Sequence, residues 1–209
     1  MTAVIETTAL FKDFGRTRAV WNLDLTVAEG SVFALLGPNG SGKTTTIKLL
    51  LNLLRPSAGT AVVLGTSSRN LGPPQLQQIG YVSENQDVPG WMTARQLLEY
   101  CRAMYPGWDD AFCDELRPQL DLPMDRPLGR LSRGARAKAV LLSSLAYRPR
   151  LLVLDERPSV DSTRWCGRRC YRPSGAWLAT KAAPCSSPPT IWRRSSAWPS
   201  GSGSSMTAF

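Results

Sequence analysis

With 209 residues, of which 43% are hydrophobic and 20% charged, the chain is long enough for one α/β domain with a buried core and short for two. It has five cysteines without metal-like spacing and no histidine, so neither a disulfide framework nor a zinc site is expected. No apolar run approaches the ~20 residues of a membrane span, so a spanning segment is not expected. A secretory signal over residues 1–13 is not expected either. The net charge of +9 does not characterise the domain, because residues 157–209 hold 8 Lys/Arg and a single acid while residues 1–156 hold 17 Lys/Arg and 15 Asp/Glu.

Apolar alternation and compact apolar runs predict strands, and apolar residues at helical spacing predict helices. Strands are expected at residues 4–10, 20–27, 31–36, 61–64, 79–82 and 151–154. Helical spacing over residues 47–54 predicts a first helix that stops at residues 55–59, and further helices are expected at 93–105, 109–120 and 132–147. Thr93 and Asp109 stand at helix starts, where their side chains are favourable. Strands that alternate with helices predict a mainly parallel sheet with sites at the carboxyl ends of its strands.

The strand at residues 31–36 runs directly into a glycine-rich segment. Glycines let the backbone curl so that successive N–H groups point at phosphate oxygens, and the following helix start adds a partial positive charge. The spacing is that of a phosphate-binding P-loop, in which Lys43 reaches the β- and γ-phosphates and the Thr44 hydroxyl binds Mg²⁺. The alternative is a glycine turn that only joins a strand to a helix. The sequence predicts an ATP site formed by Gly37, Pro38, Asn39, Gly40, Ser41, Gly42, Lys43, Thr44 and Thr45.

A second candidate group follows the apolar run at residues 151–154, which leads into Asp155 and Glu156. Asp155 is expected to orient Mg²⁺ or its bound water, and Glu156 is expected to polarise the attacking water as general base. Two acids after an apolar run are also what a strand presents where it meets solvent. Behind a P-loop the catalytic interpretation is favoured, with Lys43 and Glu156 as the catalytic residues.

Four motifs follow one another along residues 4–156: the P-loop, Ile-Gly-Tyr-Val at 79–82, Leu-Ser-Arg-Gly at 131–134, and the Asp-Glu pair at 155–156. In this order and spacing the chain resembles the nucleotide-binding subunit of an ABC transporter. The resemblance implies a P-loop NTPase core with a mainly parallel sheet, N-terminal antiparallel strands and a helical insert at about residues 93–148. It also implies a dimer that holds two Mg-ATP between the P-loop of one copy and the signature segment of the other.

The resemblance assigns roles to four further positions. Phe14 matches the aromatic residue that stacks on adenine, although it also suits an ordinary core position next to a turn. Ser132 and Gly134 match the signature motif, which contacts the γ-phosphate of the ATP held by the opposite subunit. The motif reads LSRGA here instead of the usual LSGGQ. Capping of a helix by Ser132 is the alternative and is compatible with that role. Glu84 aligns with the Q-loop glutamine, where a carboxylate can still ligate Mg²⁺, and its alternative is a solvated loop acid.

The segment 157–209 does not fit the family, which requires a D-loop and a switch histidine after Glu156. The segment is rich in Trp, Cys, Ser, Pro and Arg, and we expect it to be irregular or disordered, without a native-like fold. We hypothesise that two extra bases after the codon for Glu156 displace the reading frame. Permitted codons for residues 157–172, read two bases later, spell PFSGLDPLVREEVLQ, which contains a D-loop, and the same displacement over residues 187–196 permits SSHDLAEIE. The alternative is a genuine basic tail that binds nucleic acid or anionic lipid.

The expected function is that of the ATP-binding subunit of an ABC transporter, with ATP and Mg²⁺ as ligands and with activity impaired in this chain. The expected partners are a transmembrane permease subunit and a second nucleotide-binding subunit, in a homodimer or heterodimer, and no nucleic acid. The expected location is cytoplasmic, peripheral on the inner face of the cell membrane. The alternatives are an ATP-binding pseudo-ATPase without turnover and a soluble ABC-type ATPase that is not tied to transport.

Overall fold

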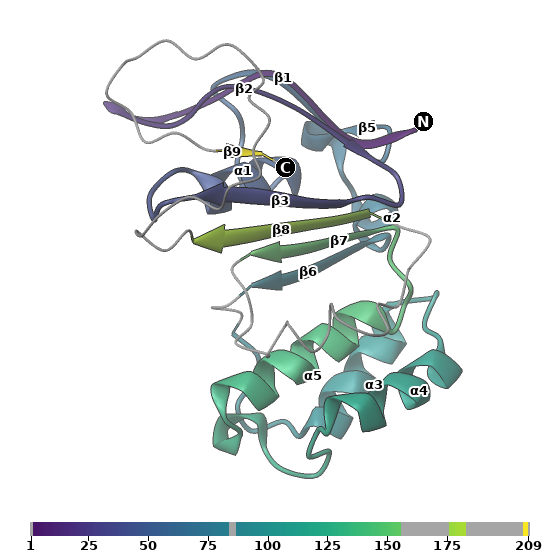
Figure 1. The fold of residues 1–209 in the computed structure, drawn as a ribbon. Helices are drawn as coiled ribbons and strands as arrows, with labels where there is room; N and C mark the ends of the chain where they lie inside the picture. The colour runs from purple at the N-terminus through teal and green to yellow at the C-terminus, as the bar shows by residue number, and fades with distance from the viewer. Residues whose placement is uncertain (1, 84–86, 156–175, 183–206, 209) are drawn as a thin grey trace, which may run out of the picture.

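Helix α1 (Lys43–Leu50) lies between two β-sheets in the computed structural model, and a group of three helices forms a further layer beyond the second sheet (Figure 1). The structure describes residues 2–83, 87–155, 176–182 and 207–208, and it gives side chains for the first two of these ranges. The arrangement is the α/β architecture expected from the sequence.

The first sheet is antiparallel and comes mostly from the beginning of the chain, as expected. Its strand order is β2-β1-β4-β5. The first two strands are longer than their apolar runs because cross-strand pairing continues to Phe14 and Thr17, on either side of the turn. The bounds are β1 Ala3–Phe14, β2 Thr17–Ala28, β4 Ala58–Val63 and β5 Thr66–Ser67.

Strand β1 is irregular around Ala9, where its pairing register shifts against both neighbouring strands. Ala9 has a φ of 43°, and Gly59 on β4 has a φ of 77°. A Cβ atom on Gly59 would overlap the Ala9 carbonyl group. Gly59 is therefore required both for its left-handed conformation and for the close approach of the two backbones.

We expect the substitution Gly59→Ala to lower the free energy of unfolding by about 3 kcal/mol, because backbone strain and steric overlap add together. Gly65→Ala is the matched control, since Gly65 has the same φ of 77° but no described atom within 4 Å of the position that a Cβ would take. Chemical denaturation of both variants measures the difference. Equal destabilisation would show that the approach of Ala9 has no effect of its own.

The second sheet has the order β6-β7-β8-β3-β9, and its first four members are parallel. The bounds are β3 Val32–Gly37, β6 Ile79–Ser83, β7 Leu151–Asp155, β8 Ala176–Ala182 and β9 Thr207–Ala208, the last pairing antiparallel with β3. Because the four strands are parallel, their carboxyl ends meet at one edge of the sheet, on the left in Figure 1. This confirms the mainly parallel sheet predicted from the sequence.

The structure departs from the expected irregular tail at residues 176–182, which form β8. This strand pairs in parallel with β3 on one side and with β7 on the other. Without it, two neighbouring strands would leave their facing backbone N–H and C=O groups unpaired. The segment has only a short apolar run, which by itself is a weak signal for a strand, and its pairing depends on the two strands that flank it in the fold. The other residues of this tail, 157–175, 183–206 and 209, lie outside the described residues, apart from the two-residue strand β9.

Apolar residues point to both faces of the parallel sheet, as buried parallel strands require. Leu151 and Val153 of β7 pack in the core around α1, whereas Leu152 packs with the helical layer on the other face. Successive residues of a strand point in opposite directions. The unbroken apolar run at residues 151–154 therefore reflects two cores that share one strand.

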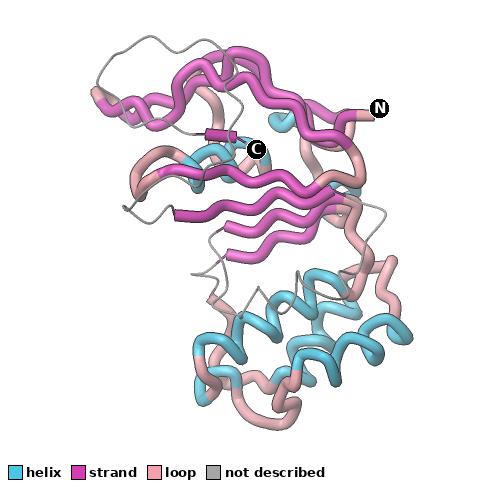
Figure 2. The backbone as a smooth tube through the Cα atoms, in the orientation of Figure 1, coloured by secondary structure: helices cyan, strands magenta, loops and turns pink. Residues whose placement is uncertain are grey.

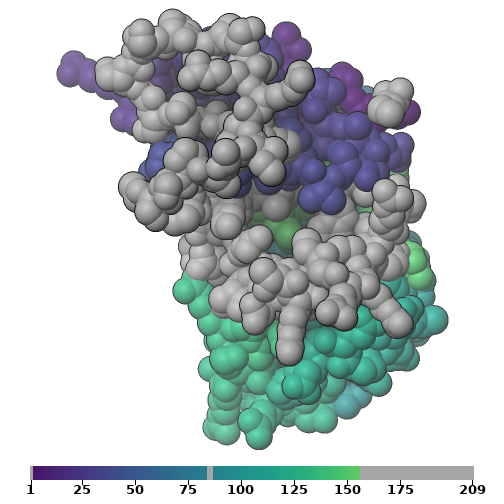
Figure 3. All heavy atoms as spheres, in the orientation of Figure 1, coloured from purple at the N-terminus to yellow at the C-terminus, as the bar shows by residue number. Residues whose placement is uncertain are grey.

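The helical insert lies on the far side of β6 from β3 (Figures 1 and 2) and makes up the teal lower part of the face in Figure 3. Its helices are α3 Ala94–Met104, α4 Asp110–Leu120 and α5 Arg133–Leu145. Shorter helical segments are η1 Ser68–Asn70, α2 Pro73–Leu76 and η2 Leu128–Arg130. Within the described ranges, none of the helices has the length and apolar character needed to cross a bilayer.

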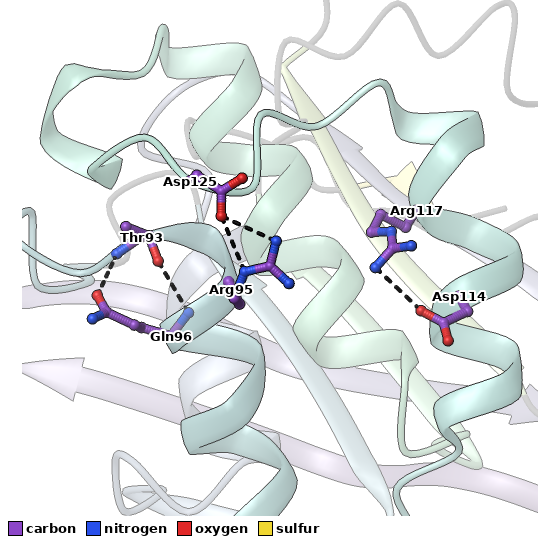
Figure 4. Close-up of polar contacts among 6 residues, drawn as sticks. All are labelled: Thr93, Arg95, Gln96, Asp114, Arg117 and Asp125. Carbon is purple, nitrogen blue, oxygen red and sulfur yellow. Dashed lines mark hydrogen bonds and ion pairs between the residues drawn. The ribbon is translucent and has the colours of Figure 1, made fainter.

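Side chains at the starts of α3 and α4 satisfy the first backbone N–H groups of these helices. The backbone N–H of Gln96 donates to Thr93 Oγ1 at 3.2 Å, and that of Thr93 donates to Gln96 Oε1 at 2.9 Å, a reciprocal capping box (Figure 4). The backbone N–H of Phe112 donates to Asp109 Oδ1 at 2.9 Å. Both helix starts predicted from the sequence are confirmed.

Helix α1 ends at Leu50, earlier than its apolar spacing predicts. Asn52 takes a left-handed conformation with a φ of 59°, and the N–H groups of Leu53 and Leu54 donate to the carbonyl oxygen of Lys48 at 2.8 and 3.0 Å. These bonds satisfy a carbonyl in the last turn and close the helix. The predicted stop at residues 55–59 is therefore wrong by several residues.

Candidate nucleotide-binding site

The candidate site begins where β3 ends and α1 starts, at the edge formed by the carboxyl ends of the parallel strands (Figure 1). Gly40 and Gly42 have φ values of 84° and 88°, a region that other residues rarely adopt. Gly42 is also the N-cap of α1, and the Thr46 N–H donates to its carbonyl oxygen at 2.8 Å. The loop therefore has the curled backbone and the helix start that an anion-binding P-loop needs.

Lys43 is the first residue of α1 and is buried, with 4% of its surface exposed. Its Nζ donates hydrogen bonds to the carbonyl oxygens of Gly37 and Pro38, both at 2.9 Å. Both acceptors are neutral carbonyl oxygens, so neither of these hydrogen bonds pairs the ammonium group with a negative charge. A phosphate oxygen would be a stronger acceptor for the same group.

Thr44 lies beside Asp155, although 111 residues separate them in the sequence. Thr44 Oγ1 donates to Asp155 Oδ1 at 2.9 Å, and the carboxylate is 4% exposed at the end of β7. The pKa of the Tyr81 hydroxyl, on the adjacent strand β6, is raised mainly because the side chain is buried and also because the Asp155 carboxylate lies nearby. The two residues that the sequence assigns separately to Mg²⁺ thus meet at one point of the fold.

The side-chain environment fits a bound nucleotide with Mg²⁺. Ser41, 6% exposed, has a buried Oγ that lacks a hydrogen-bond partner among the described residues, and such a group is costly unless a ligand satisfies it. No group of three or more possible metal ligands occurs among the residues whose side chains are described. Thr44 and Asp155 supply two oxygens, which suits Mg²⁺ because this ion commonly takes its other ligands from phosphates and water.

Phe14 lies at the end of β1 and is 48% exposed, so it does not occupy the ordinary core position that was its alternative. The ammonium of Lys12 lies 4.9 Å from the centre of the Phe14 ring. The sequence interpretation did not include Lys12. Lys12 and Phe14 are two positions apart, but the strand expected from the sequence ends at residue 10 and the pairing register of β1 shifts between Lys12 and Asp13, so strand alternation does not predict this contact.

Ser132 and Gly134 lie at the start of α5, in the helical insert. The Ala135 N–H donates to Ser132 Oγ at 3.2 Å, so Ser132 is the helix cap that its alternative interpretation predicts. In the described part of the chain no recorded hydrogen bond joins these residues to the P-loop, and their contact with a nucleotide stays a prediction. Glu84 and Glu156 lie outside the described residues.

A cavity of about 220 Å³ lies elsewhere, near the amino ends of β6 and β7. Its lining includes the stacked rings of Tyr105 and Tyr147 and the side chains of Arg148 and Arg150. Arg148 and Arg150 are paired with Asp109 and Glu29 respectively. No candidate nucleotide-binding residue lines this cavity. The candidate nucleotide-binding residues lie instead at the carboxyl ends of the parallel strands.

The family model described as "ABC transporter" matches residues 20–159 of this chain. The chain belongs to the ABC transporter family. The match contains the whole P-loop, the Ser-Arg-Gly segment at 132–134 and Asp155. The resemblance on which the sequence interpretation rests is therefore confirmed at the level of the family.

Curated proteins named as ATP-binding proteins are similar over about three-quarters of the chain. The ABC transporter ATP-binding protein YtrB of Bacillus subtilis (strain 168) is 31% identical over 153 residues, which cover 73% of this chain and 52% of that protein. The daunorubicin resistance ATP-binding protein DrrA2 of Streptomyces coeruleorubidus is 37% identical over 153 residues, covering 71% of this chain and 48% of the relative. The chain thus spans about half the length of these relatives.

Solved structures of ABC transporter proteins share the fold. A structure described as the ATP binding subunit of an ABC transporter superposes with a TM-score of 0.67 at 20% identity, over 85% of this chain and 79% of the other. A nucleotide-free ATP-binding cassette from an ABC transporter gives a TM-score of 0.65 at 21% identity, over 86% and 81%. At these identities the comparison establishes the fold, and the P-loop NTPase core expected from the sequence is confirmed.

Proposed function

We propose that the chain is the ATP-binding subunit of an ABC transporter and that it couples ATP binding and hydrolysis to a separate membrane-spanning subunit. The observation that carries the proposal is the P-loop, in which Gly40 and Gly42 curl the backbone ahead of Lys43 and Thr44. The family match and the relatives, whose names describe ATP-binding proteins, support it.

Each residue of the site has a distinct part in this proposal. Lys43 exchanges its two carbonyl acceptors for oxygens of the β- and γ-phosphates, and the Ser41 hydroxyl donates to a phosphate oxygen. Thr44 and Asp155 exchange their mutual hydrogen bond for contacts with Mg²⁺ or its water. When bound, Mg²⁺ neutralises charge on the phosphates. Glu156 holds the attacking water and accepts its proton.

The nucleotide is shared between two copies or between this chain and a related subunit. Phe14 stacks on the base, while Ser132 and Gly134 of the opposite subunit approach the γ-phosphate through the start of α5. This start and the P-loop lie on the same side of the molecule, the left side in Figure 1, which permits one face to serve both roles. The subunit works at the inner face of the cell membrane, where ATP-driven closure of the pair moves a permease subunit.

The proposal is tested by comparing nucleotides and partners. We expect the full chain to bind MgATP at least about 100-fold more tightly than AMP, because the P-loop residues recognise the β- and γ-phosphates that AMP lacks. Isothermal titration calorimetry measures both affinities. Equal affinities would contradict the proposal. Co-purification with a polytopic membrane protein supports the transporter role, whereas recovery with ribosomes would favour a soluble ABC-type ATPase.

We also propose that residues 157–209 are read in a displaced frame. The family match ends at residue 159, close to the codon at which the displaced frame begins to spell a D-loop. The absence of histidine from the whole chain supports the same idea, because the displaced frame permits one in SSHDLAEIE. A second candidate function follows from this tail: an ATP-binding protein that turns ATP over poorly or not at all.

A further inference from the structure

The end of the first hairpin combines an exposed aromatic ring with a cation. Lys12 Nζ lies 4.9 Å from the centre of the Phe14 ring, within the range of a cation–π contact. Phe14 nevertheless keeps 48% of its surface exposed. One side of the ring is thus held by the ammonium while a large part of the side chain stays accessible to a flat ligand.

The ammonium of Lys12 is itself anchored. Lys12 Nζ donates to the carbonyl oxygen of Arg55 at 2.8 Å, in the segment that follows α1. Two further bonds join the same parts of the chain: the Asp13 N–H donates to Ser57 Oγ at 3.0 Å, and the Ser57 N–H donates to the Phe11 carbonyl oxygen at 2.9 Å. The hairpin end is therefore tied to the segment behind α1, the helix whose first residues close the P-loop.

This link places the end of the hairpin, which carries the ring, with respect to the phosphate site. The short helix α1 joins the P-loop to the 55–57 segment, and Lys12 connects that segment to the Phe14 ring. A base whose phosphates lie on the P-loop would meet the ring at a set distance. Holding a contact group in place before binding removes the cost of ordering it on binding.

We propose that Lys12 is a positioning residue for the nucleotide base, which holds one face of the Phe14 ring from its anchor on the Arg55 carbonyl so that the other face receives the base. This inference rests on the proposed ATP-binding function and extends it to a residue outside the P-loop. Lys12 acts through Phe14 and touches no phosphate. Its removal therefore affects binding of the base and leaves binding of the phosphates unchanged.

The chain provides a matched control on the same hairpin. Arg18 lies over a different aromatic ring, with its Cζ 4.0 Å from the centre of Trp21. Lys12→Met and Arg18→Met each lower the net charge by one and each remove one cation–π contact. Beyond these shared losses, Lys12→Met removes the hydrogen bond to the Arg55 carbonyl and Arg18→Met removes the 3.9 Å ion pair with Asp13, and only Lys12→Met takes a cation from the Phe14 ring.

The experiment measures the affinity of the full-length variants for MgATP and for magnesium with inorganic triphosphate, which has no base. We expect Lys12→Met to weaken MgATP binding about 3- to 5-fold and to leave triphosphate binding unchanged. Lys12→Arg keeps a cation over the ring and is expected to bind MgATP within about 2-fold of the unchanged chain. In a Phe14→Leu background, which itself weakens MgATP about 10-fold, Lys12→Met is expected to have no further effect.

Three results overturn the inference. If Lys12→Met weakens MgATP and triphosphate equally, Lys12 acts by its charge alone. If Arg18→Met matches Lys12→Met, the loss reflects general electrostatics of the hairpin. If Lys12→Met changes neither affinity, the ring does not depend on Lys12. Failure of the unchanged chain to bind either ligand is a different result, because it overturns the proposed function itself and this inference with it. Unfolding midpoints of all variants show whether a loss of binding comes from a loss of fold.

Discussion

Replacing Lys43 with methionine will weaken MgATP binding by about 100-fold or more, because charge-assisted hydrogen bonds to phosphate oxygens each contribute about 1.5–3 kcal/mol. Lys43 is buried at the first position of α1 and already has its Nζ directed at the P-loop backbone, bonded to the carbonyls of Gly37 and Pro38. Methionine keeps the length of the side chain and removes its charge. Equilibrium titration with MgATP measures the loss.

The control for this substitution is Lys48→Met, which removes the same charge from the exposed side of the same helix. We expect Lys48→Met to bind MgATP like the unchanged chain. Because Lys43→Met also leaves two carbonyl oxygens without their donor, its unfolding midpoint must be measured alongside. Unchanged MgATP affinity in a folded Lys43→Met variant would contradict the assignment of the P-loop.

Deleting the first two bases of codon 157 will raise the rate of ATP hydrolysis per subunit by about 100-fold or more, because the restored D-loop and switch histidine complete the groups around the phosphates while Glu156 is already present in both chains. Under the displaced-frame proposal, the restored chain continues from Glu156 into PFSGLDP and later gains the histidine of SSHDLAEIE. Lys43, Thr44 and Asp155 are the same in both chains. The steady-state release of phosphate from MgATP measures the difference.

The restored chain also provides its own control. Glu156→Gln in that chain is expected to return hydrolysis to about the level of the chain as it stands, while MgATP binding persists. Equal hydrolysis by the restored and the unrestored chains would contradict the proposal. The gene sequence gives an independent test, since third bases that do not spell the two motifs would exclude a displaced frame.

Local features of the fold were predictable because their determinants lie within a few residues of one another. Thr93 caps α3 through Gln96, three positions away, and Asp109 caps α4 through Phe112 in the same way. Gly40 and Gly42 have the positive φ values that a curled phosphate loop requires, and nothing distant in the chain is needed to explain them. The end of α1 was missed because Asn52 in its left-handed conformation closes the helix where the apolar spacing continues.

The candidate site was predictable by residue type but not by contact. Thr44 and Asp155 were each assigned to Mg²⁺ from their motifs, yet their hydrogen bond exists only because the parallel sheet brings the ends of β3 and β7 to one edge. The contact of Lys12 with Phe14 joins two nearby residues, but the anchor of Lys12 on Arg55 depends on the packing of the hairpin against the segment behind α1.

The sequence by itself therefore determined the P-loop, the helix starts, the apolar strands and the family, because each depends on short-range backbone preferences or on motifs of adjacent residues. Only the tertiary structure decided which polar groups meet, where Lys12 is anchored, and that residues 176–182 fill the place between β3 and β7. The physical reason is that strand pairing and side-chain contacts join residues far apart in the chain, whose partners are set by the burial of whole sheets and helices rather than by their neighbours.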